Sequence, residues 1–291
     1  MNSLKTVSGA GRSGAFSFLD GVGLGLDLRQ PQVMAILNVT PDSFSDGGRF
    51  QDCAQALDRA AKVIEEGAAI LDIGGESTRP GAAPVSVDEE LARVIPVIEG
   101  VRARFDTPIS IDTSKPEVMR QAVAAGAGMI NDVYALRQEG ALETAAACGV
   151  PVCLMHMQGE PRSMQRAPRY ENVVAEVCRF LEQRVAACVS AGIDRRLLLV
   201  DPGFGFGKSL EHNLELMRWL PELQTLELPL VVGVSRKSMI GKVLDRATDD
   251  RLIGSVTLAA LAVWQGAAIV RVHDVGETVD ALRVISAVRG H

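Results

Sequence analysis

Arg271 and His273 are two residues whose types and spacing suggest binding chemistry. They flank Val272 at the end of an apolar segment, and in an extended chain residues two apart project to the same side. A lone histidine is more often a structural residue than a ligand. Beside Arg271, however, it supplies a second potential cation in the same direction. The pair therefore predicts a site for an anionic group, such as a phosphate.

Polar residues recur at one position of the sequence pattern, directly after short apolar runs. A strand that ends where water begins explains one or two such residues, but not eight that include amides and acids. Because barrel enzymes place their active sites at the carboxyl ends of their strands, these residues predict a functional ring there. In chain order they are Asn38, Asp72, Asp112, Asn131, His156, Asp201, Ser235 with Lys237, and Arg271 with His273.

Two of the connecting segments, residues 38–48 and 74–81, are rich in Gly, Ser, Thr, Asp and Pro. Each is longer than the usual connection between a strand and a helix. Ordinary turns are the plainer interpretation, and mobile lids that close over a charged substrate are the functional one.

Residues 201–209 look like a nucleotide-binding P-loop that ends in Lys208. The spacing of that motif requires a glycine five residues before Gly207, where this chain has Pro202. An ATPase is therefore disfavoured. The segment follows an apolar run and precedes a helical pattern, so a role of its backbone in anion binding stays open.

Eight short apolar runs must position the polar ring, and helical patterns fill the gaps between them. Such runs, free of charge except for Asp72, are typical of parallel strands buried on both faces. Eight strand–helix units predict an α/β fold, the (β/α)8 TIM barrel. A doubly wound open sheet is the alternative, but it would usually show fewer strands and a Gly-rich turn after the first. The runs are residues 33–37, 69–73, 108–111, 128–130, 152–155, 197–200, 230–234 and 268–270.

Helix-start signals and a leading hairpin complete the pattern. Ser86 with Glu89 three residues later forms a capping box, and Ser114 with Glu117 predicts a second helix start that has Pro116 in its first turn. Apolar stripes with helical spacing run from Leu57 to Ile64 and from Leu91 to Val101. Alternating apolar residues at 16–18 and 24–28, separated by residues 20–23, predict a short β-hairpin.

Composition limits the class of protein. The chain has 291 residues, 47% of them hydrophobic, and a formal net charge of −6, so a large core is expected and a nucleic-acid partner is not. No apolar run approaches the roughly 18–20 residues that span a bilayer. We expect a tail in residues 1–14 that is disordered and has no secretory signal, followed by one domain over 15–291. Five cysteines at irregular spacing favour thiols in a reducing cytoplasm over disulfides.

In combination, these segments resemble the dihydropteroate synthases of folate biosynthesis. The resemblance runs from about Gln32 to the C-terminus, with every motif at a predicted strand end and in order. Its motifs are ILNVTPDSFSDGG from Ile36, DIGGESTRPGA from Asp72, IDTSKPEV from Ile111, MIND from Met129, LMHMQGEPRSMQ from Leu154, DPGFGFGKS from Asp201, GVSRKSMIG from Gly233 and RVHD from Arg271.

The resemblance implies a reaction and its partners. In this family 7,8-dihydropterin-CH2-pyrophosphate condenses with p-aminobenzoate to give dihydropteroate and pyrophosphate. The resemblance also implies Mg²⁺, a cytoplasmic homodimer, and inhibition by sulfonamides. Because the motifs contain no obvious nucleophile or general base, we expect a dissociative path in which the diphosphate leaves first.

The resemblance also assigns roles to residues of this chain. Asp201 would accept the pterin amino and ring N–H groups, and Asp112 and Asn131 would read the rest of that edge. Lys237 would meet the ring carbonyl, Arg271 would stack on the pterin and face the diphosphate with His273, and Asn38 would be the Mg²⁺ ligand. The expected catalytic residues are Asp112, Lys237, Arg271 and His273. Further expected substrate contacts are Thr78, Arg79, Met155, Phe206 and Ser238, with Phe44 and Pro80 as possible walls of the aminobenzoate subsite.

Three alternatives remain at this point. A pterin-binding methyltransferase would share the barrel and pocket, but it would have little use for two long loops and an anion pair. A non-catalytic pterin-binding protein would be expected to lack an essential motif, and none is lost. A phosphate-binding isomerase barrel would usually offer a glutamate or lysine base.

Overall fold

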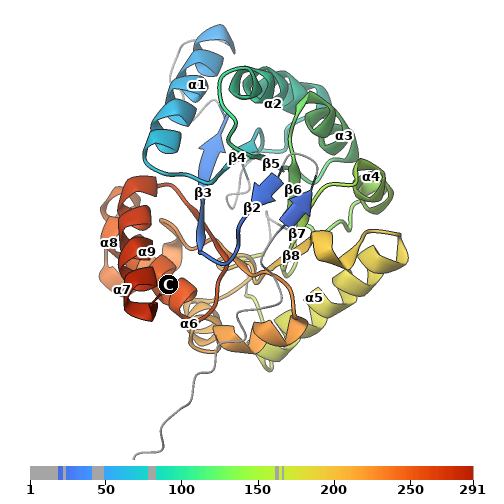
Figure 1. Cartoon of the computed structure of the whole chain (residues 1–291). Coiled ribbons are helices and arrows are strands. Elements are labelled where there is room, and N and C mark those ends of the chain that lie inside the picture. Colours follow the sequence, from blue (N-terminus) through green and yellow to red (C-terminus); the bar gives the residue numbers. More distant parts are fainter. Residues whose placement is uncertain are drawn as a thin grey trace, which may run out of the picture.

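Eight parallel strands form a ring in the computed structural model of the chain (Figure 1). The structure describes residues 19–21, 24–40, 49–77, 83–160, 164–165 and 167–290. The strand order is β8-β7-β6-β5-β4-β3-β10-β9, and a parallel bridge between Val200 and Leu230 joins the two ends of this series. The predicted barrel is therefore confirmed over the open sheet. Its strands are β3 Gln32–Asn38, β4 Ile70–Gly74, β5 Ile109–Asp112, β6 Met129–Asp132, β7 Val152–Met155, β8 Leu198–Asp201, β9 Val231–Val232 and β10 Ile269–Val272.

Helices surround the ring of strands (Figure 1). Val94, Ile98 and Val101 of α2 are fully buried against the barrel, and burying one such side chain stabilises the fold by roughly 1.5–3 kcal/mol. The predicted stripe thus marks the inward face of that helix. The helices are α1 Arg49–Glu65, α2 Val87–Arg102, α3 Pro116–Ala125, α4 Ala141–Cys148, α5 Val173–Ser190, α6 Leu210–Arg218, α7 Ser238–Leu244, α8 Leu252–Trp264 and α9 Val275–Arg289.

The interior of the barrel is apolar at one end and polar at the other. The apolar end is a cluster to which seven of the strands contribute one buried side chain each, and Leu26 of the leading hairpin packs against it. Two positions further along several strands, the inward residues are polar, as the alternation along a strand requires. The amino-terminal end of the barrel is therefore filled by apolar side chains, and the carboxyl-terminal end holds the polar residues. The seven strand residues are Met34, Ile70, Met129, Cys153, Leu199, Val231 and Ile269.

The hairpin and the capping signals agree with the prediction except in detail. β1 (Leu19–Gly21) pairs antiparallel with β2 (Leu24–Leu26), so the first strand includes Asp20 and Gly21, which the sequence pattern assigned to the turn. The ladder uses backbone groups, so these two residues pair regardless of their side chains. The expected tail, residues 1–14, lies outside the described residues.

Helix α3 begins one residue later than its Ser114 signal predicted. Lys115 is the N-cap and Pro116 is the first helical residue, whereas Ser86 caps α2 as expected by accepting the Glu89 amide. Proline disfavours helical backbone in the residue before it and is itself favoured at the first position of a helix. Pro116 therefore sets the start of α3.

Candidate functional site

Arg271 lies at the centre of the polar end of the barrel, between two carboxylates. Its Nε donates to Oδ2 of Asp72 over 2.5 Å, and its Nη2 donates to Oδ2 of Asp112 over 2.7 Å. These partners come from β10, β4 and β5, whose carboxyl ends meet at the rim of the barrel. The guanidinium that the sequence assigned to an anion site is therefore oriented by two acids, and its side chain keeps 20% exposure toward the mouth.

Burial dominates the ionisation of this cluster. Burial raises the pKa of Asp112 to about 7, although the positive charge of Arg271 opposes the shift. Burial also disfavours the charged form of Arg271, but Asp72 and Asp112 outweigh it and raise the pKa of the guanidinium. Arg271 is thus a permanent cation, and Asp112 is an acid that titrates close to neutral pH.

Asp72 belongs to the predicted polar ring, although the sequence suggested no individual role for it. Its carboxylate is fully buried, and its Oδ2 also accepts the Asn131 amide over 3.1 Å. Among the residues that the structure describes, its Oδ1 has no hydrogen-bond partner. The signal was present, because Asp72 is the only charge inside an apolar run, and a buried carboxylate requires partners.

Asp201 and Lys237 form a second polar group next to Arg271. Oδ1 of Asp201 accepts the Gly203 amide over 2.7 Å, and burial raises the pKa of this carboxyl while Lys237 opposes the shift. Burial lowers the pKa of Lys237 to about 8, with Asp201 acting in the other direction. The Lys237 ammonium donates to the Phe204 carbonyl and lies 4.6 Å from the centre of the Phe206 ring. An acceptor, a cation and an aromatic face are therefore adjacent.

Asn38 lies at the same rim, beside Asp112. A Cβ placed on Gly74, between them, would be 3.7 Å from Oδ1 of Asn38 and 3.4 Å from Cβ of Asp112. His273 follows β10, and both its backbone N–H and its Nδ1 lie within hydrogen-bond distance of the Ser235 hydroxyl, at 3.2 and 3.0 Å. Its carbonyl accepts the Arg59 guanidinium over 2.8 Å. His273 is thus directed at Ser235, and Arg271 is directed at the carboxylates.

The structure describes some of the remaining predicted residues and not others. Met155 is buried at the end of β7, and its Cγ would be 3.3 Å from a Cβ on Gly203. Ser238 is exposed and is the first residue of α7, so it lies next to Lys237 at the rim. Four of the predicted residues, Phe44, Thr78, Arg79 and Pro80, lie outside the described residues.

The segment 201–209 is not a nucleotide-binding loop. Its Gly203, Gly205 and Phe206 amides donate to Asp201, Asn213 and the Gly203 carbonyl, so they are engaged within the protein. The residue that imitated the P-loop lysine, Lys208, is buried instead of open to a phosphate. These three backbone amides are therefore not available to bind an anion.

A buried ion-pair cluster that sequence reasoning missed supports the loop after β4. Lys115 donates to both Glu76 and Glu90, and the Glu90 side chain is fully buried in α2. Glu76 also accepts the Val85 amide over 3.1 Å. No pattern in the sequence distinguishes Glu90 from the other acids of this helix start. The cluster joins the residues that follow β4 to the start of α2 and the start of α3.

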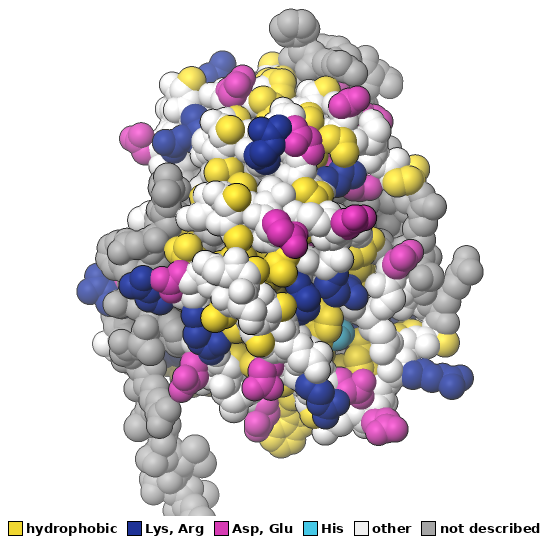
Figure 2. All heavy atoms as spheres, turned by 90° about the vertical axis from the view of Figure 1, so that its right-hand side faces the viewer, with side chains coloured by type: hydrophobic (Ala, Val, Ile, Leu, Met, Phe, Trp, Pro, Cys, Tyr) yellow, Lys and Arg dark blue, Asp and Glu magenta, His cyan; other side chains and the backbone are white. Residues whose placement is uncertain are grey.

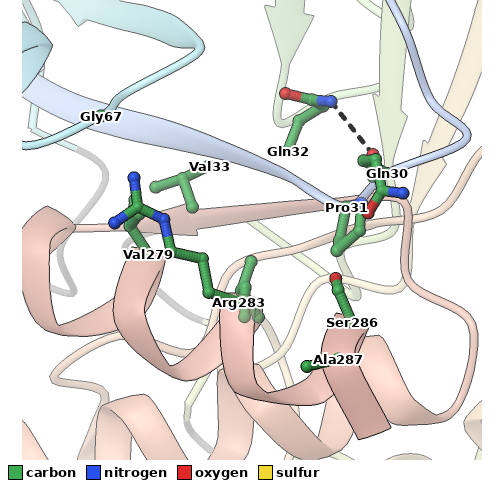
Figure 3. Close-up of a pocket in the computed structure, with 10 residues that line it drawn as sticks. Gln30, Pro31, Gln32, Val33, Gly67, Val279, Arg283, Ser286 and Ala287 are labelled. Atoms are coloured by element: carbon green, nitrogen blue, oxygen red, sulfur yellow. Dashed lines mark hydrogen bonds between the residues drawn. The ribbon is translucent and has the colours of Figure 1, made fainter. Parts of the chain in front are cut away.

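Other surfaces do not match this chemistry. A cavity of about 430 Å³ lies at the opposite end of the barrel, between the start of β3 and the last turns of α9 (Figure 3). There Arg283 and Gln32 lie among Val33, Pro31 and Val279, without the buried acids of the rim. Over α3, α4 and α5, basic and acidic side chains are interspersed (Figure 2). Within the described chain, no helix is long and apolar enough to span a membrane.

Comparison with known proteins places this geometry in context. The profile of the family described as "Pterin binding enzyme" matches residues 34–273, which include every rim position from Asn38 to His273. The chain is 57% identical over 265 residues to the dihydropteroate synthase of Escherichia coli strain K12, across 91% of this chain and 94% of that protein.

Solved structures agree with the sequence comparison. Yersinia pestis dihydropteroate synthase in a sulfonamide drug complex has a TM-score of 0.90 at 54% identity, and the match covers 94% of this chain and 99% of that one. Xanthomonas albilineans dihydropteroate synthase with 4-aminobenzoic acid has a TM-score of 0.87 at 56% identity, with 91% and 96% covered. At these identities the likeness extends beyond the fold.

Proposed function

The chain belongs to the dihydropteroate synthases, a group of pterin-binding enzymes, and we propose on this basis that its barrel rim is the synthase site. The chain condenses 7,8-dihydropterin-CH2-pyrophosphate with p-aminobenzoate, which gives 7,8-dihydropteroate and pyrophosphate in folate biosynthesis. The observation that carries the assignment is the adjacency of buried Asp201 to Lys237 and of Arg271 to Asp112. This adjacency is accounted for by the synthase reaction, without the methyltransferase or the binding-protein alternative.

Asp201 is proposed to hold the pterin. A carboxylate accepts two parallel N–H bonds, which matches the amino group and adjacent ring N–H of a pterin edge. Oδ1 of Asp201 already accepts the Gly203 amide, an arrangement that orients the group toward the barrel lumen. Asn131, held by Asp72, is proposed to read the next positions of the ring, and Lys237 to meet the ring carbonyl.

Arg271, His273 and Asn38 are proposed to form the diphosphate site. The guanidinium plane of Arg271 is fixed by two acids, so one of its faces can stack on the pterin while its remaining N–H groups donate to the anion. Asn38 supplies an amide oxygen at the rim, the type of ligand that Mg²⁺ accepts. Mg²⁺ commonly keeps waters and substrate phosphates as ligands, so Asn38 would bind it together with waters and the diphosphate. Bound Mg²⁺ would neutralise charge on the leaving group.

The aminobenzoate is proposed to bind above the pterin. Phe206 offers an aromatic face at the rim, and exposed Ser238 lies next to Lys237. Thr78 and Arg79 are proposed to join from the loop after β4, and Phe44 and Pro80 to line the same subsite. Met155 lies deeper, beside the Gly203 turn, and is proposed to contact the pterin.

We propose that the C–O bond to the diphosphate breaks before the amine attacks. The pterin then carries a positive methylene carbon, which Asp112 and Asp201 stabilise as fixed negative charges. The p-aminobenzoate nitrogen forms the new C–N bond and afterwards loses a proton to water. A secondary isotope effect at that methylene well above unity would support this order, and a value near unity with chemistry rate-limiting would contradict it.

A cytoplasmic homodimer is proposed for the assembly. Neighbouring helices α8 and α9 present exposed apolar side chains, among them Ile253, Trp264 and Val284, which a second copy would cover. All five cysteines are free thiols, as expected in a reducing compartment. Light scattering of Ile253→Lys against the unaltered protein tests the dimer. A dimer of unchanged stability in the variant would contradict this surface.

The deciding experiment measures pyrophosphate release from 7,8-dihydropterin-CH2-pyrophosphate with Mg²⁺, with and without p-aminobenzoate. We expect release that depends on the amine, yields dihydropteroate, and stops when EDTA removes the metal. Tight pterin binding without release under any of these conditions would contradict the synthase assignment and favour a binding protein.

A further inference from the structure

The turn formed by residues 203–207 is held almost entirely by side chains. It belongs to neither a helix nor a strand, yet each of its five successive carbonyls accepts a hydrogen bond from a side chain. Unpaired backbone acceptors in such a buried turn would be costly, so these donors determine its shape. The donors are Lys208 to Gly203 and Phe206, Lys237 to Phe204, Gln165 to Gly205, and Tyr170 to Gly207.

Lys208 occupies the centre of this turn. It is 2% exposed, and its Nζ lies 2.8 Å from the Gly203 carbonyl, 3.2 Å from the Phe206 carbonyl and 2.9 Å from Nδ1 of His156. Burial, with Lys237 adding to it, lowers the pKa of Lys208, and the charged ammonium with three N–H donors and the neutral amine with two can each serve both carbonyls. Burial, with Lys208 adding to it, lowers the pKa of His156 to about 2, so the ring is neutral and can accept at Nδ1.

The turn also has no room to shift toward β7. A Cβ on Gly203 would lie 1.9 Å from the His156 carbonyl oxygen, and one on Gly207 would lie 2.4 Å from that of Gln158. Both glycines have positive φ, at 67° and 61°, which a larger residue would adopt with strain. Close packing on one side and the Lys208 bonds within the turn therefore restrict its conformation.

Two groups of this turn contact Lys237 directly. The Phe204 carbonyl accepts from its ammonium, and the Phe206 ring lies 4.6 Å below it. We propose that Lys208 is a positioning residue: by holding the Gly203 and Phe206 carbonyls it fixes the Phe204 carbonyl and the Phe206 ring, and through them Lys237. This inference rests on the proposed function, in which Lys237 meets the pterin and Phe206 borders the aminobenzoate.

The test compares Lys208→Met with Lys242→Met, which removes an exposed lysine of α7. We expect Lys208→Met to raise KM for p-aminobenzoate and for the pterin substrate at least tenfold, because both subsites lose a fixed wall. Lys242→Met should match the unaltered enzyme. If Lys208 served folding alone, Lys208→Met would lower the melting temperature, and kcat would fall through loss of active protein. Both KM values would then stay unchanged. That outcome would overturn the proposal.

A readout independent of catalysis separates this proposal from the proposed function. In protein labelled with 4-fluorophenylalanine, the Phe206 fluorine signal is assigned by its absence in Phe206→Leu. It should shift in Lys208→Met and stay in place in Lys242→Met. If no variant, the unaltered chain included, releases pyrophosphate, the proposed function fails while the fluorine signal still decides the role of Lys208. If Lys208→Met does not fold, Lys208→Gln, whose side chain is one atom shorter and cannot take the place of Nζ between the two carbonyls, is judged by the same criteria.

Discussion

Asp112 makes the enzyme's pH dependence a direct test of the proposed site. Its pKa is raised to about 7 by burial, and its proposed role requires the negative form. With that pKa, about nine-tenths of Asp112 is ionised at pH 8 and about one-tenth at pH 6. Protonation of Asp112 removes both a negative charge and a partner of Arg271, which alone would lower kcat/KM for the pterin substrate about tenfold from pH 8 to pH 6. Because the pKa of Lys237 is about 8, about half of that cation is neutral at pH 8, so we expect a net fall of about fivefold.

The assay records initial rates of pyrophosphate release at low pterin substrate and saturating p-aminobenzoate. Asp112→Asn keeps the shape of the side chain but cannot ionise, so it should lower kcat/KM and remove the acidic limb. Asp280→Asn, at an exposed position of α9, is the matched control and should keep the limb. A flat profile from pH 6 to pH 8, or an unchanged limb in Asp112→Asn, would refute the reasoning. In the second case the limb would belong to the substrate diphosphate.

Three further predictions concern single residues. Asp201→Ala should weaken the binding of a dihydropterin alcohol by roughly 1.5–3 kcal/mol in calorimetry, the scale of a hydrogen bond to a charged group, and unchanged affinity would remove Asp201 from the pterin site. His273→Ala should weaken binding of the diphosphate substrate and spare the bare alcohol, so equal losses for both ligands would argue against its anion role. Gly203→Ala should destabilise the fold by about 1–3 kcal/mol or more in urea denaturation, because the added Cβ meets the His156 carbonyl at positive φ. A change within about 0.5 kcal/mol would show that the turn can relax.

The sequence predicts the barrel well because its signals are local. Each strand is a short apolar run, and each polar residue at a strand end is visible in the order of the chain. Alternation along β10 correctly indicates that Arg271 points away from the surrounding helices. Strand positions and side-chain alternation depend on a few neighbouring residues, so they can be predicted without knowledge of the tertiary structure.

The partners of Arg271 could not be predicted in the same way. Alternation indicates which residues face the lumen, but Asp72 and Asp112 meet Arg271 only because the sheet places β4 and β5 two and three strands from β10 and curves them around the same lumen. The spacing at Pro202 correctly argued against a phosphate loop, but no pattern in the sequence indicated that Lys208 would be buried and bonded within its own turn. Contacts across the barrel are non-local, and a single sequence does not contain them.

The hairpin at the amino-terminal end has a consequence for the order of events during turnover. Leu26 packs against the apolar end of the barrel, so within the described residues the polar end is the one open to ligands. With the assignments proposed above, Asp201 and Asn131 are buried, whereas Ser238 is exposed and Phe206 is partly exposed. The pterin must then arrive before the aminobenzoate covers it. With those assignments the two substrates would use the same entrance, and we expect an ordered kinetic mechanism.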